Sequence, residues 1–549
     1  MVFLLYTIAI MNSSKTSKNT KDNKYYITTP IYFPSGKWHL GHSYTTVCCD
    51  SLARFNRLEG KEVFYLTGTD EHGQKIEENA KKAGKSPKEF VDELVASIKE
   101  LWKLFNIQYD GFIRTTDFHH EKTVQGIFNK LLKQGDIYKG SYSGFYCTPC
   151  ESFWTNTQTK GGKCPDCGRE VAVSQEECYF FRLSKYKDRL LKLLTEDNFL
   201  EPKSRVNEMV NNFLKSESGL EDLAVSRTSF SWGVPVNGDE NHIIYVWIDA
   251  LSNYITALGY NSDKSFEEQS EHFKKFWPAD LHLMAKEIVR FHALIWPALL
   301  MALDLPLPKK IYGHGWLLFD GDKMSKSKGN VVDPFILCDR YGVDAMRYCL
   351  LREISFGQDC DYSTENFLMR INTDLCNDLG NLTKRTMAMS RQYFEGIVIK
   401  PKPGEGTEFD VELIEKINDL YSAVKGKLEK LEISKALESI FEVISSSNKY
   451  IDNTTPWILN KEGTPEAKIR LNAVIYNLLE VIRVCSNMLL PFMPDTPQII
   501  YNQLGLKLPK DFKSTKHGLI KQYTTVEGEA LFLRLDIKKE LEELEKINL

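Results

Sequence analysis

The sequence has no long hydrophobic run and no excess of either charge. No apolar stretch approaches the ~20 residues that cross a membrane, so we expect no membrane-spanning helix. The 70 basic residues are balanced by 74 acidic ones, which argues against a protein that holds nucleic acid mainly by bulk positive charge. Any contact with RNA must therefore be local and depend on shape. The composition, 42% hydrophobic and 26% charged, is typical of a soluble globular protein.

The N-terminus lacks the marks of a secretory signal peptide. Val2–Ile10 is apolar, but no basic residue precedes it and no small-residue cleavage site follows it. The polar run from Asn12 to Lys24 then leads directly into a strand-like segment. We expect either a start site assigned too far upstream or, at most, a disordered tail over residues 1–24. Deleting residues 1–10 should then leave activity intact.

Length and cysteine usage bound the organisation of the chain. At 549 residues it exceeds what one hydrophobic core covers, and roughly 150 residues per domain predicts three or four structural units. Of the 12 cysteines, four lie in metal-like pairs and the rest are scattered, which favours a reducing cytoplasm over a disulfide framework.

The first half of a nucleotide-binding fold is predicted at the end of this tail. Tyr25–Tyr32 is β-prone, Pro34–Gly36 ends it, and His39-Leu40-Gly41-His42 runs into a helix-compatible segment, Tyr44–Leu58. Gly41 has no side chain, so a nucleotide base can approach the backbone there, and a helix start offers amide groups to phosphate. The two histidines would then face the phosphates.

Asp70 is a second candidate in the same half. It follows the predicted strand Glu62–Thr67 within Gly68-Thr69-Asp70-Glu71-His72-Gly73. The carboxyl ends of parallel strands are where doubly wound sheets bind ligands. The alternative is that Asp70 only caps the helix that follows.

The second half is predicted to begin near His242. Ile243–Trp247 and Leu281–Met284 are short apolar runs suited to buried strands, and helix-like spacing follows at Ile248–Leu258 and Glu287–Leu303. Lys310-Ile311-Tyr312-Gly313-His314-Gly315 then leads to Lys323-Met324-Ser325-Lys326-Ser327. Alternating strands and helices imply a parallel sheet. In the final loop, Lys323 and Lys326 stand among small residues, so their ammonium groups can close over a triphosphate as charge moves to pyrophosphate.

Two Cys-x-x-Cys pairs lie between the halves. Cys147 and Cys150 are followed, after residues 151–163, by Cys164 and Cys167. Four thiolates at this spacing can close a tetrahedron around zinc, and a closed site of this kind is structural. The alternatives are four unligated cysteines or an iron–sulfur or rubredoxin-like site.

The last third of the chain reads as a helix bundle. Helix-length segments with few strand signals run through Ile371–Tyr393, Val411–Leu431, Ser434–Asn453, Pro465–Leu490 and Asp536–Leu549. Asn381 and Arg385 stand four apart on one helical face and can reach exposed base edges, although ordinary helix surface explains them equally well. Pro456-Trp457 offers an indole on which an unstacked base could lie, although an isolated Trp is more often core.

These features resemble the methionyl-tRNA synthetase family of class I aminoacyl-tRNA synthetases across about residues 25–540, because four separate motif regions agree in order. The resemblance implies an α/β protein. Its Rossmann-type parallel-sheet core would be split by a zinc-binding insertion and followed by an α-helical anticodon-binding bundle. The implied units are a tail, a first catalytic half, a connective insertion, a second catalytic half, a linking stem-contact segment and the bundle, at 1–24, 25–118, 119–240, 241–335, 336–370 and 371–549.

The resemblance also assigns roles to individual residues. His39 and His42 would stabilise the five-coordinate α-phosphate, and Lys323 and Lys326 the departing pyrophosphate. The wider ATP set is His39, Gly41, His42, Glu287, Lys323, Met324, Ser325, Lys326 and Ser327, with Mg²⁺ bound to the ATP. Asp70 would hold the amino group of methionine. The thioether would be enclosed, with a Tyr254 hydroxyl near the sulfur, by Pro30, Ile31, Phe33, Trp247, Ala250, Leu251, Tyr254, Phe291 and His292.

The implied activity is ATP-dependent activation of L-methionine and transfer to tRNA(Met), the initiator tRNA included, in the cytoplasm. Asn381, Arg385, Pro456 and Trp457 match positions that read the CAU anticodon, and Cys147, Cys150, Cys164 and Cys167 match one structural zinc. Three positions depart from the commoner family pattern. Glu287, expected at the ATP ribose, replaces Asp, Ala285 replaces Gly, and Phe33 replaces Tyr. The chain stops at Leu549 without the dimer-forming domain of many members, so we expect a monomer.

Four rival hypotheses explain less of the sequence. A leucine, isoleucine or valine enzyme would need a far larger insertion for editing, and a cysteine enzyme would place histidines around a catalytic zinc. An RNA-binding relative without catalysis would be expected to have lost the histidines or the loop lysines, which are intact. A zinc-ribbon module would account for only a few dozen residues and leave the ATP motifs unexplained.

Overall fold

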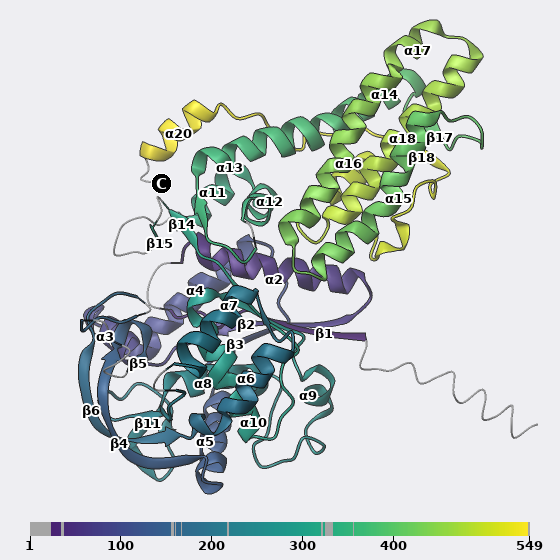
Figure 1. The fold of residues 1–549 in the computed structure, drawn as a ribbon. Helices are drawn as coiled ribbons and strands as arrows, with labels where there is room; N and C mark the ends of the chain where they lie inside the picture. Colours follow the sequence, from purple (N-terminus) through teal and green to yellow (C-terminus); the bar gives the residue numbers. More distant parts are fainter. Residues whose placement is uncertain are drawn as a thin grey trace, which may run out of the picture.

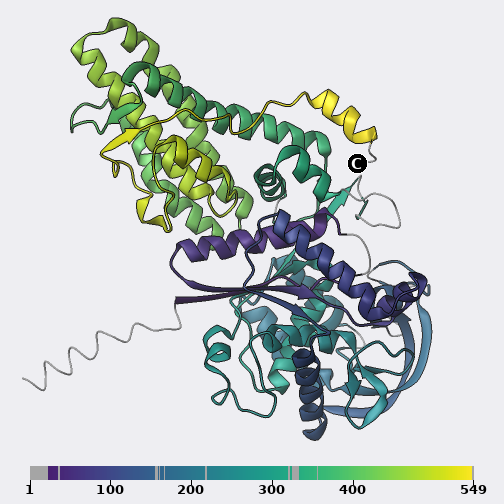
Figure 2. The same ribbon diagram turned by 180° about the vertical axis from the view of Figure 1, so that it is seen from behind.

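The computed structural model describes the backbone of residues 23–34, 38–154, 159, 161–165, 167–216, 219–319, 322–323, 333–354 and 356–546. The predicted tail therefore lies almost entirely outside the described residues. A β-sheet domain, a long antiparallel hairpin beside it and a helical bundle are arranged along the molecule in both views (Figures 1 and 2). Within these described segments, no helix is both long and apolar enough to cross a bilayer.

The centre of the sheet domain is a six-stranded parallel sheet. Its order is β3 (Gly111–Arg114), β2 (Glu62–Thr69), β1 (Lys24–Thr28), β12 (Leu281–Ala285), β13 (Ile311–His314) and β7 (Leu200–Glu201). The order reverses between β1 and β12, strands more than 250 residues apart in sequence. Doubly wound sheets bind their ligands outside the carboxyl ends of strands at such a reversal, so the fold itself marks the crevice where a site is expected.

Helices pack around this sheet. The helices of the sheet domain and the insertion are α2 (Leu40–Leu58), α3 (Gln74–Lys82), α4 (Pro87–Leu104), α5 (Phe118–Lys133), α6 (Lys187–Glu196), α7 (Lys203–Met209), α8 (Val246–Thr256), α9 (Glu271–Phe276) and α10 (Trp296–Ala302). Of these, α2, α8 and α10 correspond to the three helices predicted from the sequence. The predicted helix Glu287–Leu303 is interrupted: it opens with a 3-10 turn, passes through a π-helical turn at Phe291–Ile295, and becomes α10.

One predicted strand of the parallel sheet is wrong. The run Ile243–Trp247 does not enter that sheet: β11 (Asp239–Ile244) ends at Ile244 and lies in a small antiparallel sheet with β10 (Pro235–Val236) and β9 (Ser226–Arg227). Trp247 is already in the first turn of α8. A short apolar run does not distinguish a buried strand from the first turn of a buried helix.

The insertion is built on a long hairpin. β4 (Ile137–Cys147) pairs with β6 (Ala172–Phe181) along its whole length, and β5 (Ser152–Trp154) and β8 (Leu223–Ala224) complete an antiparallel sheet. Half-buried and exposed residues alternate over residues 138–143 of β4, which fits a sheet with one partly covered face. The hairpin extends away from the parallel sheet, and its tip lies beside α3 (Figure 1).

The bundle follows a linking segment. The linker contains β14 (Leu317–Phe319), β15 (Asp322–Lys323), α11 (Pro334–Tyr341), α12 (Val343–Glu353), β16 (Cys360–Tyr362) and α13 (Thr364–Arg370). The bundle helices confirm the predicted ones closely. They are a π-helical segment (Ile371–Gly380) continued by α14 (Asn381–Phe394), α15 (Glu408–Leu428), α16 (Ile433–Thr454), α17 (Pro456–Glu462), α18 (Pro465–Leu489) and α19 (Thr496–Gln503), with a hairpin of β17 (Ile397–Ile399) and β18 (Gln522–Thr524). The predicted helix Asp536–Leu549 forms as α20 (Ile537–Lys546), but it lies away from the bundle, beside α13 and α11 (Figure 1), where Glu540 pairs with Arg340.

A fully buried ion pair joins the two large parts. Asp50 of α2 lies 2.7 Å from Arg347 of α12, and both side chains are inaccessible to solvent. The same guanidinium donates to the backbone carbonyls of Phe492, beyond α18, and Phe105, beyond α4. The helix that begins at His39-Leu40-Gly41-His42 is thus connected to the bundle through Arg347 of the linker.

Candidate active site and metal centre

The candidate active site lies at the carboxyl edge of the parallel sheet. Loops after β1, β2, β12 and β13 carry, in turn, the histidine motif, Asp70, Glu287 with Phe291 and His292, and the path to Lys323. These four loops are distant in sequence and are brought together only because their strands are parallel and adjacent.

The two motif histidines begin α2. The Nδ1 atom of His39 accepts the backbone N–H of Gly41 at 3.2 Å, and the backbone N–H of His39 donates to Nδ1 of His42 at 3.2 Å. Their ring centres are 3.9 Å apart. A Cβ on Gly41 would lie 3.1 Å from the His39 ring, so glycine allows both imidazoles to pack at the helix start. This end of the helix favours bound anions.

Residues after β13 and β12 face the same helix. Thr45 of α2 is 2.7 Å from Nε2 of His314, whose Nδ1 donates to the carbonyl of Gly315. Burial lowers the pKa of His314. The indole N–H of Trp316 donates to the carboxylate of Glu287 at 2.6 Å, which places the predicted ribose contact at this edge. His314 and Trp316 were not predicted, although His314 ends an apolar strand beside a candidate loop.

The lysine loop is described only at its start. The backbone of Lys323 in β15 pairs with Leu318 of β14. The predicted residues Met324, Ser325, Lys326 and Ser327 lie outside the described residues.

Asp70 is positioned from two strands. Its backbone N–H donates to the carbonyl of Tyr32 at 3.0 Å, which joins its loop to the segment after β1. A Cβ on Gly68 would lie 2.1 Å from the carbonyl oxygen of Ile113, so only glycine permits this path. Oδ1 of Asp70 is buried and has no hydrogen-bond partner among the described residues. Burial, reinforced by the carboxylate of Asp249, raises the pKa of Asp70 well above its ordinary value.

A buried charge network supports this corner of the site and was not predicted. Asp249 of α8 lies 2.7 Å from Nδ1 of His72 and 2.8 Å from Nε2 of His120. Burial opposes protonation of His72, but Asp249 and Glu121 together outweigh it and raise the pKa of His72 to about 10. Asp249 is correspondingly kept ionised, with a lowered pKa despite its burial. Only His72 could have been suspected from the sequence, because it lies two residues after Asp70.

Most residues of the predicted side-chain pocket belong to one large apolar core. Ile31, Trp247, Leu251, Tyr254 and Phe291 pack in the same core, and Ala250 and Pro30 are buried beside them in sequence. The rings of Trp247 and Phe291 lie face to face, with centres 3.6 Å apart and planes 5° apart. Phe33, two residues after Ile31, is half-buried and belongs to none of the buried clusters.

His292 and Tyr254 form the polar part of that pocket. Nδ1 of His292 lies 2.9 Å from the carbonyl of Ile288, and Nε2 lies 2.7 Å from the hydroxyl of Tyr254. Burial lowers the pKa of His292 to about 4, so the imidazole is neutral. The pocket therefore combines an aromatic wall with one uncharged hydrogen-bonded pair.

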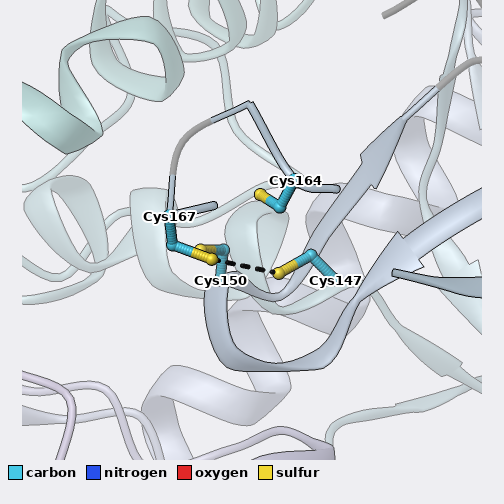
Figure 3. Close-up of side chains that lie close together, drawn as sticks. All are labelled: Cys147, Cys150, Cys164 and Cys167. Atoms are coloured by element: carbon cyan, nitrogen blue, oxygen red, sulfur yellow. Dashed lines mark hydrogen bonds between the residues drawn. The ribbon is translucent and has the colours of Figure 1, made fainter. Parts of the chain in front are cut away.

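The four predicted cysteines converge in the insertion (Figure 3). Sγ atoms of Cys147, Cys150, Cys164 and Cys167 all lie within 4.8 Å of one another, and those of Cys147 and Cys167 are 3.6 Å apart. In the part of the chain that the structure describes, this is the one cluster suited to a metal. Four thiols and no histidine or carboxylate make a closed set, which fits a structural ion.

The predicted base-reading residues lie on the bundle. Asn381 begins α14 and is exposed, and Arg385 lies one turn later, half-buried. Pro456 is buried at the start of α17, whereas Trp457 is 46% exposed, so the core alternative for this indole is wrong. Helix α17 lies at the end of the bundle farthest from the parallel sheet (Figures 1 and 2).

Comparisons with known proteins agree with this geometry. The family model described as tRNA synthetases class I (M) matches residues 25–177 and 170–387, and the anticodon binding domain of methionyl tRNA ligase matches residues 400–543. Fold and site thus define a class I aminoacyl-tRNA synthetase.

Relatives that match nearly the whole chain point to one family. The methionine–tRNA ligases of Caldanaerobacter subterraneus subsp. tengcongensis and Clostridium perfringens are 57% and 56% identical, each over 95% of this chain and 80% of the relative. Mycobacterium tuberculosis methionyl-tRNA synthetase bound by methionyl-adenylate aligns at a TM-score of 0.87 with 38% identity, covering 93% of this chain and 100% of that one. The chain belongs to the methionyl-tRNA synthetase family.

Proposed function

We propose that this methionine–tRNA ligase carries out its reaction with the residues assembled at the carboxyl edge of the parallel sheet. ATP and L-methionine would first form methionyl-adenylate and pyrophosphate, and the 3′ end of tRNA(Met) would then take the methionyl group. The single observation that supports this best is Asp70: a buried carboxyl group with an unpartnered oxygen, close enough to Tyr254 of the aromatic cluster to interact with it electrostatically.

Asp70 would bind the ammonium group of methionine. Burial raises the pKa of Asp70 and so disfavours its charged form while the site is empty, and an adjacent ammonium group would favour that form. The side chain would pack against the apolar set that the pocket supplies. That set is Pro30, Ile31, Phe33, Trp247, Ala250, Leu251, Tyr254, Phe291 and His292.

Adenylate formation needs no general base on the protein. The methionine carboxylate is already ionised; its oxygen bonds to the α-phosphorus while the bond from that phosphorus to the bridging oxygen breaks. His39 and His42 would stabilise the five-coordinate phosphate, and Lys323 and Lys326 the departing pyrophosphate. Mg²⁺, bound with the ATP, would neutralise phosphate charge. Gly41, Glu287, Met324, Ser325 and Ser327 would complete the nucleotide contacts.

The bundle would select the tRNA. Asn381 and Arg385 of α14 and Pro456 and Trp457 of α17 would read the CAU anticodon of both initiator and elongator tRNA(Met). An exposed indole at the tip of the bundle suits stacking on an unpaired base, because every base has a π-face.

The cysteine cluster would hold one zinc ion. Tetrahedral zinc with Zn–S bonds of ~2.3 Å separates neighbouring sulfurs by roughly 3.8 Å, close to the 3.6 Å between Cys147 and Cys167. Because the closed site leaves no open ligand position, zinc would brace the insertion and take no part in the reaction.

The organisation follows from these assignments. We propose catalytic halves at 25–118 and 241–335, an insertion at 119–240, a linker at 336–370 and an anticodon-binding bundle at 371–549, in a cytoplasmic monomer. Residues 200–201 of the insertion also supply β7 of the parallel sheet.

Charging assays on the purified protein test the proposal. Wild-type protein should charge initiator and elongator tRNA(Met) with methionine. Asp70→Asn should raise the KM for methionine, whereas His39→Asn should lower the rate of adenylate formation by about 10²–10³, the usual cost of one lost transition-state donor. Normal charging of tRNA(Met) by Asp70→Asn would overturn the assignment of the amino group.

A further inference from the structure

The methionine pocket and the cysteine-bearing insertion are connected by a row of planar side chains. Trp247 and Phe291 form the face-to-face pair described above. The guanidinium carbon of Arg290 lies over the Phe291 ring at 4.5 Å and over the ring of Trp154 at 4.0 Å. The row therefore runs from Trp154 of the insertion, through Arg290 and Phe291, to Trp247.

Trp154 is fixed to the cysteine cluster. It ends β5, four residues after Cys150, and is 3% exposed. Together with Cys147 and Cys164 it forms the small buried core of the knuckle. The position of its indole is therefore set by the same packing that brings the four thiols together.

Phe291 lies at the start of an irregular turn of its helix. Residues Phe291–Ile295 form a π-helical turn that precedes α10. A π turn inserts an extra residue into a helix, which re-aims the side chains on it, and such turns are frequent at functional sites. Arg290, immediately before the turn, places its guanidinium over the same Phe291 ring that stacks on Trp247.

A second contact reaches the same wall. The carbonyl of Glu151, the residue after Cys150, accepts the hydroxyl hydrogen of Tyr245 at 2.7 Å. Tyr245 is the residue before α8, which carries Trp247 in its first turn. The side-chain carboxylate of Glu151 also accepts the backbone N–H of Lys75 at 3.1 Å. Lys75 lies at the start of α3, the helix that follows Asp70.

We propose that Arg290 is a positioning residue that determines specificity for the methionine side chain. By packing between Trp154 and Phe291, it holds the Phe291–Trp247 wall at the spacing set by the insertion. The inference rests on the proposed assignment of Phe291 and Trp247 to the pocket. An apolar pocket discriminates between side chains only when it fits closely. The cysteine-bearing knuckle, which holds Trp154, would therefore contribute to methionine specificity by fixing the position of the pocket wall.

Arg290→Lys tests this directly, because it keeps the positive charge and removes the planar guanidinium. We expect the KM for methionine to rise by about tenfold with the KM for ATP and the zinc content unchanged. The ratio of methionine to norleucine activation should fall. Methionine titrations without ATP, followed by tryptophan fluorescence, should show the same loss of affinity.

Trp154 and a matched control complete the test. Trp154→Leu should reproduce the effect of Arg290→Lys, and Trp154→Phe should restore most of the methionine affinity, since it keeps a ring for the guanidinium. Arg182→Lys is the control: Arg182 lies over Tyr138 at 4.3 Å in the same insertion, away from the pocket residues. It should leave both KM values unchanged.

The outcomes separate this inference from the pocket assignment. If Trp247→Ala and Phe291→Ala leave the KM for methionine unchanged, the pocket assignment is wrong. If those two raise it but Arg290→Lys does not, the pocket stands and the inference is overturned. A parallel rise of the KM values for methionine and ATP in Arg290→Lys would also overturn it, because that result indicates general disruption.

Discussion

The hydroxyl of Tyr254 donates a hydrogen bond to Nε2 of His292 over 2.7 Å, and both side chains are buried. The direction follows from the other nitrogen. Nδ1 of His292 faces the carbonyl of Ile288 at 2.9 Å, and a carbonyl only accepts. In the neutral imidazole Nε2 is then the acceptor. The hydroxyl hydrogen of Tyr254 is therefore engaged by His292, and the pair supplies a fixed polar edge to the proposed methionine pocket.

Tyr254→Phe should destabilise the protein and weaken methionine binding. It leaves Nε2 of His292 buried without a donor, which costs about 1–3 kcal/mol. The free energy of unfolding in urea and the KM for methionine measure the two effects. Tyr260→Phe is the matched control, because the Tyr260 hydroxyl is buried with no partner among the described residues. Equal losses in both variants would contradict the argument.

His292 should make stability depend on pH in the acid range. Burial lowers its pKa from an ordinary 6.5 to about 4. Between these values the unfolded chain binds the proton and the folded chain does not. The contribution, on the order of 3 kcal/mol, is therefore present above pH 6.5 and lost as pH falls toward 4. Urea midpoints from pH 7.5 to 4.5 should show a shallower slope for His292→Gln than for wild type; parallel slopes would be contrary evidence.

Removing the metal should loosen the insertion. Cys147 and Cys164 are almost fully buried, so loss of one ligand leaves the cluster unable to close around zinc. Elemental analysis should find about one zinc per chain in the wild type and much less in Cys164→Ser. Cys178→Ser, a buried cysteine outside the cluster, should retain the metal. Wild-type protein without zinc but with full thermal stability would refute the structural role.

Breaking the Asp50–Arg347 pair should lower the free energy of unfolding substantially. Asp50→Asn leaves a buried guanidinium without its carboxylate, and such losses cost about 3–5 kcal/mol. Glu412→Gln is the comparison, because Glu412 and Lys416 form an exposed pair 2.7 Å apart on α15, worth about 0.3–0.5 kcal/mol. Denaturant unfolding distinguishes them, and similar costs for the two would show that the buried pair is not a strong link between sheet and bundle.

Trp457→Ala should separate tRNA recognition from amino-acid activation. Loss of one stacked base costs about 1–3 kcal/mol, so the KM for tRNA(Met) should rise at least fivefold or so while pyrophosphate exchange with methionine is unaffected. Phe409→Ala is the control, since Phe409 is a similarly exposed aromatic residue, 41% against 46%, at the start of α15. Unchanged charging by Trp457→Ala would remove this residue from the anticodon site.

Local patterns in the sequence were sufficient for features made by local interactions. The histidine motif at a helix start, Asp70 at a strand end, the cysteine pairs and the bundle helices all depend on spacing within one segment. The run Ile243–Trp247 failed because periodicity over five residues does not separate a strand from the start of a buried helix. Only the environment of Tyr245, which bonds to Glu151 and Val225, ends the strand there.

Contacts between distant segments could not be predicted in the same way. Asp249 lies 177 residues from His72, and nothing in either segment identifies the other as its partner. The same holds for Arg290 and Trp154, which meet only because the insertion folds back onto the catalytic domain. Such pairs depend on tertiary packing, whereas the exposure of Trp457 depends on how the whole bundle ends.

The measurement that tests the central claim most directly is amino-acid-dependent ATP–pyrophosphate exchange by the purified protein. Methionine would be compared with leucine, isoleucine, valine and cysteine, with Asp70→Asn measured alongside. We predict exchange with methionine alone and its loss at the same methionine concentration in Asp70→Asn. Exchange supported by another of these amino acids, or none by folded protein that binds ATP, would contradict the assignment of the pocket and of the reaction.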